Sequence, residues 1–125
     1  MSIRARLYLL IFFLATSVTG FTQTVQWASR VIDFSSELTP IQYSAEQVLG
    51  KPDVLPAPGE SANAWTPDRA NRKEYIKVGF DNPIAIKQIA IAESYNPSAL
   101  TRIAIYDTND NEFVVTDFNG RDIAL

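Results

Sequence analysis

The sequence predicts an all-β fold, an antiparallel β-sandwich with one short helix, preceded by a signal peptide. Short apolar stretches alternate with polar turns at regular spacing through the second half of the chain, as is typical of sandwiches. A single stretch carries both helix-start and helix-stop signals. The length of 125 residues allows one domain, and 46% hydrophobic residues is an ordinary share for a globular one.

The N-terminus has the layout of a secretory signal. Arg4 and Arg6 precede an apolar run at residues 7–15, and small and hydroxyl residues follow. The run is shorter than the roughly 20 apolar residues that span a bilayer, which disfavours the alternative of an uncleaved anchor. We therefore expect a signal peptide over residues 1–20 and an exported domain over residues 21–125, located in the periplasm, at the outer membrane or outside the cell.

Composition excludes several classes of function. The chain has no cysteine and no histidine, which removes disulfides, thiolate chemistry and the commonest general base. Its net charge is −3, and without the two arginines of the signal peptide 9 basic residues face 14 acidic ones, a net charge of −5. Such a surface does not attract nucleic acid or anionic membranes. We expect no enzymatic activity, no cofactor, no nucleic-acid partner and no membrane insertion after signal cleavage.

Local signals place a strand and a short helix early in the exported domain. Residues 27–34 predict an opening strand. Ser44 and Gln47 have the spacing of a capping box at the start of a helix. Gly50 suits the left-handed residue that ends such a helix, and Pro52 prevents its continuation.

Residues 51–73 form a long segment rich in proline and polar residues, with no apolar period. Loops of this length inside a compact domain are uncommon and are functional when ordered, the alternative being a mobile insertion. Trp65 favours order, because a large apolar ring is unfavourable in water unless something covers it. We expect this ring either to pack against the sandwich or to contact a ligand.

From residue 74 onward the pattern is one strand after another. Residues 74–80 alternate apolar and polar side chains, and an isoleucine-rich strand follows at residues 84–91. A change of phase at Lys87 and Gln88 suggests either a bulge or two short strands there.

The last part of the chain predicts further antiparallel strands. Residues 100–107 and 112–118 form a couple joined by a polar turn, and Asn119-Gly120 precedes a last strand at residues 121–125. So short a final strand leaves a sheet edge unpaired, which native sheets avoid. We therefore expect the domain to be C-terminally incomplete.

The order of these segments resembles the galactose-binding-like domains of the discoidin or coagulation-factor C-type family. The shared features are an Ala-Ser opening, a short helix ending at a tight glycine, a Trp beyond a variable loop and two strands, here Ala28-Ser29, Ser44 to Gly50, Ala64-Trp65-Thr66-Pro67, Glu74 to Phe80 and Ile86 to Ile91. More closely, residues 27–125 resemble the exported N-terminal domain of OmpA-like envelope proteins of Gram-negative bacteria, through residues 42–52 and 91–97. The resemblance implies a jelly-roll-like sandwich at the bacterial cell envelope.

Four residues are candidate ligand contacts: Trp65, Glu93, Tyr95 and Asn96. The last three lie beyond the isoleucine-rich strand, at an end of the sandwich where loops gather, and offer a carboxylate, a ring and an amide suited to sugar hydroxyls. The alternative is that Tyr95 packs on the rim of the sandwich and that Asn96 with Pro97 only makes a turn.

A calcium site is conceivable but not supported. Asp107, Asn109 and Asn111 offer oxygens at alternate positions, as a calcium loop begins. Glu112 stands where an EF-hand needs glycine, and Phe118 where it needs glutamate. The resemblance adds no site either, because Leu49-Gly50 replaces the Asp-Gly usual in that family. We expect a polar turn here and no metal.

Two functions follow from these observations. The first is a non-catalytic exported binding module of the bacterial cell envelope, which holds a glycan or cell-wall polymer in its end loops. The alternative is a structural or protein-interaction domain without a small-molecule ligand, the N-terminal part of a larger OmpA-like envelope protein, which presents its open sheet edge to further polypeptide.

Overall fold

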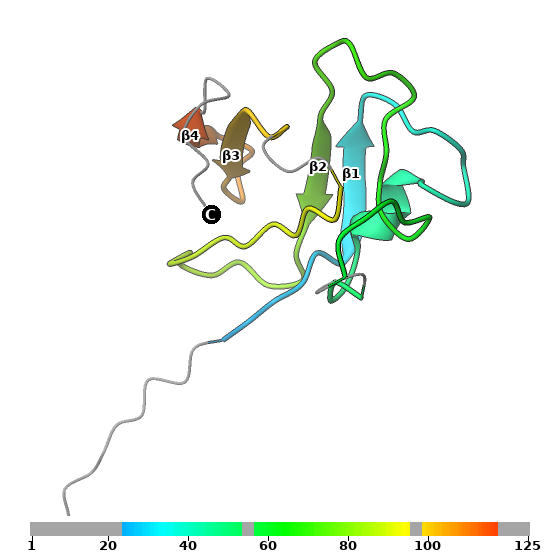
Figure 1. Ribbon diagram of the computed structural model, residues 1–125. Coiled ribbons are helices and arrows are strands. Elements are labelled where there is room, and N and C mark those ends of the chain that lie inside the picture. Colours follow the sequence, from blue (N-terminus) through cyan, green and yellow to red (C-terminus); the bar gives the residue numbers. More distant parts are fainter. Residues whose placement is uncertain (1–23, 54–56, 96–98, 118–125) are drawn as a thin grey trace, which may run out of the picture.

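The computed structural model describes residues 24–53, 57–95 and 99–117 (Figure 1). The expected signal peptide, Asn96 and the expected last strand therefore lie outside the described residues. Within the described ranges the chain is mostly β with few helical residues, and its strands form two small antiparallel sheets. The all-β class is confirmed at this level.

Each sheet is a pair of strands. β1 (Arg30–Phe34) pairs with β2 (Ile76–Gly79), and β3 (Arg102–Tyr106) pairs with β4 (Glu112–Asp117). All four strands fall inside stretches that the sequence predicts, although β1 begins later and β2 is shorter at both ends. The polar turn joins β3 to β4 as expected.

A bulge interrupts each pair of strands. In the first sheet Val31 faces Val78 and Asp33 faces Lys77, which leaves Ile32 as the additional residue of β1. Since residues directly opposite each other point to the same side of a sheet, Asp33 and Lys77 share one face. Phe34 shares the other with the residue opposite it, Ile76. The first sheet thus has a charged face and an apolar face.

The short helix is a 3-10 turn, η1 (Ala45–Val48), and its cap differs from the expected one. Ser44 makes no side-chain capping bond; instead the Glu37 carboxylate accepts a hydrogen bond from the Ala45 N–H, at 2.8 Å. Gln47 does not complete a capping box, because its side-chain amide donates to the Ile41 carbonyl. The acid eight residues upstream reaches the helix because the chain folds back, which spacing rules for local caps do not cover.

The end of η1 follows the prediction. Gly50 adopts a φ of +77°, the left-handed conformation that glycine tolerates best. Its N–H donates to the Ala28 carbonyl at 2.9 Å, which ties the end of the helix to the segment before β1.

The described part of the long loop after η1 is ordered by backbone hydrogen bonds. Leu38 N–H donates to the Thr66 carbonyl, and Tyr43 exchanges bonds with Ala62 and Thr66, all at 2.8 to 3.0 Å. These bonds join the loop to the segment that precedes η1. The Trp65 indole N–H donates to the Ser36 carbonyl at 2.9 Å, so its half-buried ring is held against the end of β1.

Two serines at the end of β1 anchor the start of β2. The hydroxyls of Ser35 and Ser36 both donate to the Glu74 carboxylate, which also pairs with Arg72 and is 7% exposed. Ser35 in addition accepts the Tyr75 N–H at 2.9 Å. The carboxylate is thus buried but fully supplied with donors, as a buried charge must be.

Few side chains are buried. Taken as whole residues, Ala45 is the only buried hydrophobic one in the described ranges and Ser44 the only buried polar one. The Glu74 side chain is 7% exposed, although its residue as a whole is half-buried. Large apolar side chains on the strands remain exposed, including Ile32 at 51% and Phe113 at 53%. The described fold is therefore held by polar contacts at its ends and lacks the apolar interior of a closed sandwich.

The isoleucine-rich stretch is not a strand, which corrects the prediction. Residues 83–93, here called the arm, leave the first sheet after β2, bend at Lys87 and return, and they form no ladder with any described strand (Figure 1). The phase change therefore marks a reversal of the chain. In the described ranges, helices long and apolar enough to span a membrane are absent.

Replacing Trp65 with phenylalanine tests the anchoring of the long loop. Trp65→Phe keeps a large ring but leaves the Ser36 carbonyl without its donor, so we expect a loss of about 1 kcal/mol in the free energy of unfolding. Urea denaturation measures it. Trp27→Phe is the matched control, because the Trp27 indole N–H has no hydrogen-bond partner among the described residues. Equal losses in both variants would contradict the anchoring role.

Acid titration tests the Glu74 cluster. The hydrogen bond from Arg72, and then that from Ser35, hold the pKa of Glu74 below its ordinary value of 4.5. A carboxyl with a lowered folded pKa stabilises the fold above its unfolded pKa and loses that contribution as pH falls through the folded value. The free energy of unfolding should thus decrease below pH 4.5, and Glu74→Gln should make this decrease shallower. An equal decrease of the free energy of unfolding with falling pH in the wild type and in Glu74→Gln would contradict this role of Glu74.

Candidate functional site

Two hydrogen bonds join three loop segments, those around Tyr43, Gly59 and Ser94. The Gly59 N–H donates to the Ser94 carbonyl at 2.7 Å, and the Tyr43 hydroxyl donates to Glu60 at 3.1 Å. Tyr43 has a φ of +57°, a left-handed conformation that is costly for an aromatic residue and is held by bonds on both sides of it. The hydrogen bond to Glu60 raises the pKa of the Tyr43 hydroxyl. These hydrogen bonds hold the three segments together as one loop cluster.

The candidate ligand residues differ in their exposure and in their contacts with this cluster. Tyr95 is 71% exposed, and Glu93 is half-buried on the other side of the Ser94 contact. Trp65 belongs to the same long loop as Gly59, but its N–H points to the Ser36 carbonyl, the geometry that the packing interpretation predicts. Asn96 lies outside the described residues. The cluster thus presents one exposed ring, that of Tyr95, two residues after the half-buried Glu93.

Groups of the turn between β3 and β4 donate hydrogen bonds to the carboxylate of Asp107, which belongs to the same turn. The Asp107 carboxylate accepts hydrogen bonds from the N–H groups of Asn109 and Asn111 and from the Asn111 side-chain amide, at 2.8 to 2.9 Å. These bonds, the side-chain one first, lower the pKa of Asp107. Asp110 takes the left-handed conformation, with a φ of +63°. The carboxylate is therefore committed to the turn, and no group of acids in the described part of the chain is arranged to hold a metal ion.

A lysine connects the two sheets. The Lys77 ammonium of β2 lies 3.7 Å from the centre of the Tyr106 ring in β3 and 2.8 Å from the Asp110 carboxylate in the turn. Tyr106 and Arg102 in turn donate to the Glu112 carboxylate, and these bonds lower the pKa of Glu112. The pairing with Asp110 raises the pKa of Lys77. The sheets thus meet through one cation–π contact and one ion pair, where a sandwich would have apolar side chains.

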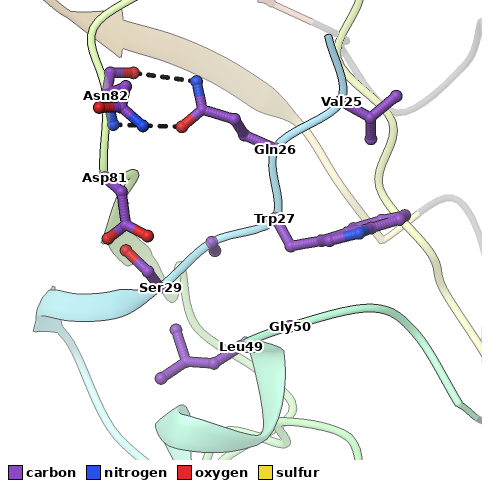
Figure 2. A pocket seen from close by; sticks show the side chains of 9 residues that line it. Val25, Gln26, Trp27, Ser29, Leu49, Gly50, Asp81 and Asn82 are labelled. Atoms are coloured by element: carbon purple, nitrogen blue, oxygen red, sulfur yellow. Dashed lines mark hydrogen bonds between the residues drawn. The ribbon is translucent and has the colours of Figure 1, made fainter.

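An open hollow lies beside the segment that leads into β1 (Figure 2). Figure 2 shows Val25 and Trp27 on one side of this segment and Asp81 with Asn82 on the other. Trp27 is 44% exposed. Since its ring points away from the polar groups, the hollow does not bring a stacking surface and hydrogen-bonding groups together for one ligand.

The same view shows how the arm is clamped at its start. The Gln26 side chain donates to the Asn82 carbonyl at 3.0 Å and accepts the Asn82 N–H at 3.1 Å, in the manner of a strand partner (Figure 2). The Gly59 to Ser94 bond closes the arm at its other end. Sequence reasoning missed both clamps and the Lys77 contact, because each joins residues far apart in the chain; the phase change at Lys87 was the only local signal of the arm.

Comparison with known proteins identifies the family. A family model described as "Pappalysin-1, SD scarf domain, C-terminal" matches residues 19–120. The chain belongs to this family. F-box/LRR-repeat protein 4 of Bos taurus is 23% identical over 111 residues, which cover 70% of this chain and 18% of that protein. This SD scarf chain thus spans less than a fifth of the length of that curated relative. No solved structure matches this chain.

The family match corrects the resemblance drawn from sequence motifs. The chain is not assigned to the discoidin or coagulation-factor C-type family, nor to OmpA-like envelope proteins. The motifs behind that resemblance are an Ala-Ser opening, a glycine-ended helix and a packed Trp. Such features meet the packing needs of many β domains, so they do not specify one family.

Removing the Lys77 charge tests the contact between the sheets. Lys77→Met keeps the aliphatic stem but loses the Asp110 ion pair and the cation–π contact, so we expect faster amide hydrogen exchange in β3 and β4 and little change in β1. Lys73→Met, at an exposed lysine outside this contact, is the matched control. Unchanged protection of both strands in Lys77→Met would show that other contacts hold the sheets together.

Proposed function

We propose that this chain is a non-catalytic binding module of an exported protein and that it acts through contacts with other polypeptide. Residues 1–20 serve as its signal peptide in this proposal, which the basic, apolar and small-residue order supports. The two sheets are parts of an antiparallel, jelly-roll-like sandwich that further polypeptide completes. The apolar face of the first sheet, which includes Phe34 at 37% exposure, supports the proposed sandwich.

One observation carries the proposal. The arm exposes four isoleucines, Ile84, Ile86, Ile89 and Ile91, at 37% to 51% of their surface, and the strands expose further apolar side chains. Contiguous apolar surface on a soluble protein marks a site of protein contact more often than a solvated face. The matched stretch is also a small part of its curated relative, which suits a module working within or between larger chains.

The charged groups of the described residues support a role without catalysis. The carboxyls with lowered pKa values are Glu74, Asp107 and Glu112, and each is occupied by donors that fix the fold. A general acid would instead need its pKa raised toward neutrality.

Glycan binding is a second candidate, favoured by the 71% exposure of Tyr95. Tyr95 follows Ser94, whose carbonyl accepts the Gly59 N–H, and is two residues from Glu93; an exposed aromatic ring and a carboxylate together can stack on and hydrogen-bond a sugar. A glycan array comparing the wild type with Trp65→Ala and Tyr95→Ala separates the candidates. Saturable binding lost in Tyr95→Ala would favour the glycan.

Site-specific photo-cross-linking in the producing cells tests the proposed protein contact. A benzophenone side chain replacing Ile86, in the exposed face of the arm, should yield covalent adducts with polypeptide because the face is covered in the cell. The same group replacing the exposed, charged Lys51 is the control and should yield far fewer. Equal labelling at both positions, or adducts with carbohydrate alone at Ile86, would contradict the proposal.

A further inference from the structure

Residues 68–73, here called the basic loop, lie between Trp65 and β2. The loop carries Arg69, Arg72 and Lys73, three of the nine basic residues that follow the expected signal peptide. Every residue of the loop is exposed, and the loop arches beyond the end of the first sheet at which β1 ends and β2 begins (Figure 1). Exposed loop tips of this kind are the preferred sites of proteolytic cleavage.

The main chain of the basic loop is open to an incoming enzyme. From Arg69 to Lys73, none of the main-chain N–H and carbonyl groups makes a hydrogen bond with a described residue. Extended peptides bind by pairing their main chain with a strand of the partner, and cleavage of a segment that is already paired first requires local opening. The basic loop needs no such opening.

Both ends of the basic loop are tied to the two serines that follow β1. At its first residue the Asp68 N–H donates to the Ser36 hydroxyl at 3.1 Å. Just beyond its last residue the Tyr75 N–H donates to the Ser35 hydroxyl at 2.9 Å, and the Glu74 carboxylate accepts hydrogen bonds from both serines. The loop is therefore presented on a fixed base that a cut within the loop leaves intact.

The contacts of the three bases single out Arg69. The Arg72 guanidinium forms ion pairs with two carboxylates, one of them that of Glu74. Lys73 directly precedes this Glu74, whose side chain is 7% exposed. Arg69 is exposed and makes no hydrogen bond or ion pair with a described residue, and the small, exposed Ala70 follows it. An enzyme can therefore bind the Arg69 side chain without breaking a contact of the fold.

We propose that the basic loop is a processing site, cut after Arg69 by an endopeptidase whose specificity pocket is acidic. A carboxylate in such a pocket binds the guanidinium group in a charge-assisted pair. Water is the second substrate of the hydrolysis. The bond between the Arg69 carbonyl carbon and the Ala70 nitrogen breaks, the carbon gains the water oxygen and becomes a carboxylate, and both water protons end on the nitrogen, which becomes an ammonium group.

The cut product stays together as two chains. The ladder between β1 and β2 joins residues on the two sides of the cut, and so do the two hydrogen bonds between Gln26 and Asn82. The ion pair between Asp68 and Arg72 also crosses it. Cleavage thus gives a two-chain module with a new N-terminus at Ala70, whichever partner covers the apolar surface.

Limited digestion of the full chain with trypsin, whose pocket holds an acid, tests the choice of bond. The first cut within residues 24–117 should follow Arg69, and intact-mass spectrometry should find a fragment that begins at Ala70. Arg69→Gln should slow this first cut at least about tenfold, because the acid of the pocket then lacks its charged partner. Lys87→Gln removes the exposed base at the bend of the arm and should be cut as fast as the wild type. A first cut after Arg72, Lys73 or Lys87 would overturn the assignment.

Two further measurements test the product and the processing itself. The two fragments should elute together in size-exclusion chromatography and separate in concentrated urea, and fragments that separate without urea would overturn the two-chain product. Amine labelling of the protein from the producing cells, extracted with protease inhibitors, should find an N-terminus at Ala70. Uncut protein alone in those cells would overturn the processing, and it would leave the cross-linking test of the proposed function unaffected.

Discussion

The described fold depends on the junction between two adjacent serines and a buried glutamate. Ser35 and Ser36 directly follow β1, and their hydroxyls donate to the carboxylate of Glu74, which precedes β2 and pairs with Arg72. The Ser36 carbonyl also accepts a hydrogen bond from the Trp65 indole N–H. The same two serines therefore connect β1 to the start of β2 and hold the long loop. A buried carboxylate tolerates the loss of any one donor poorly, because the remaining charge is then left without compensation.

Polar anchoring of this kind changes what the apolar residues are available to do. A closed sandwich buries its isoleucines and phenylalanines in an interior between two sheets. Here the sheets meet through Lys77, Tyr106 and Asp110, and the isoleucines of the arm remain at the surface. The charged contact joins the second sheet to the first without using the isoleucines of the arm, and the proposed contact with other polypeptide needs such exposed apolar groups.

Sequence reasoning reached the features that local chemistry decides. Apolar stretches bounded by polar turns predict the positions of all four strands, Gly50 marks the end of η1, and the Asp107 turn forms as its asparagines predict. It failed where residues distant in the chain compete with local ones. Glu37 replaced Ser44 as the cap of η1 because the chain folds back, and the stretch around Lys87 reversed where a straight strand was expected. The ring of Tyr95 is exposed, but no local pattern distinguishes a ligand contact from an ordinary surface residue.

Polar contacts hold this fold together, and its apolar surface stays exposed in the isolated monomer. The heat capacity change of unfolding measures that surface directly, because it scales with the apolar area that unfolding newly exposes. Calorimetry at concentrations where the chain is monomeric should give a value per residue well below the roughly 12–15 cal/mol/K of ordinary globular domains. A value within that range would contradict the account, since it would require an apolar interior that closes without a partner.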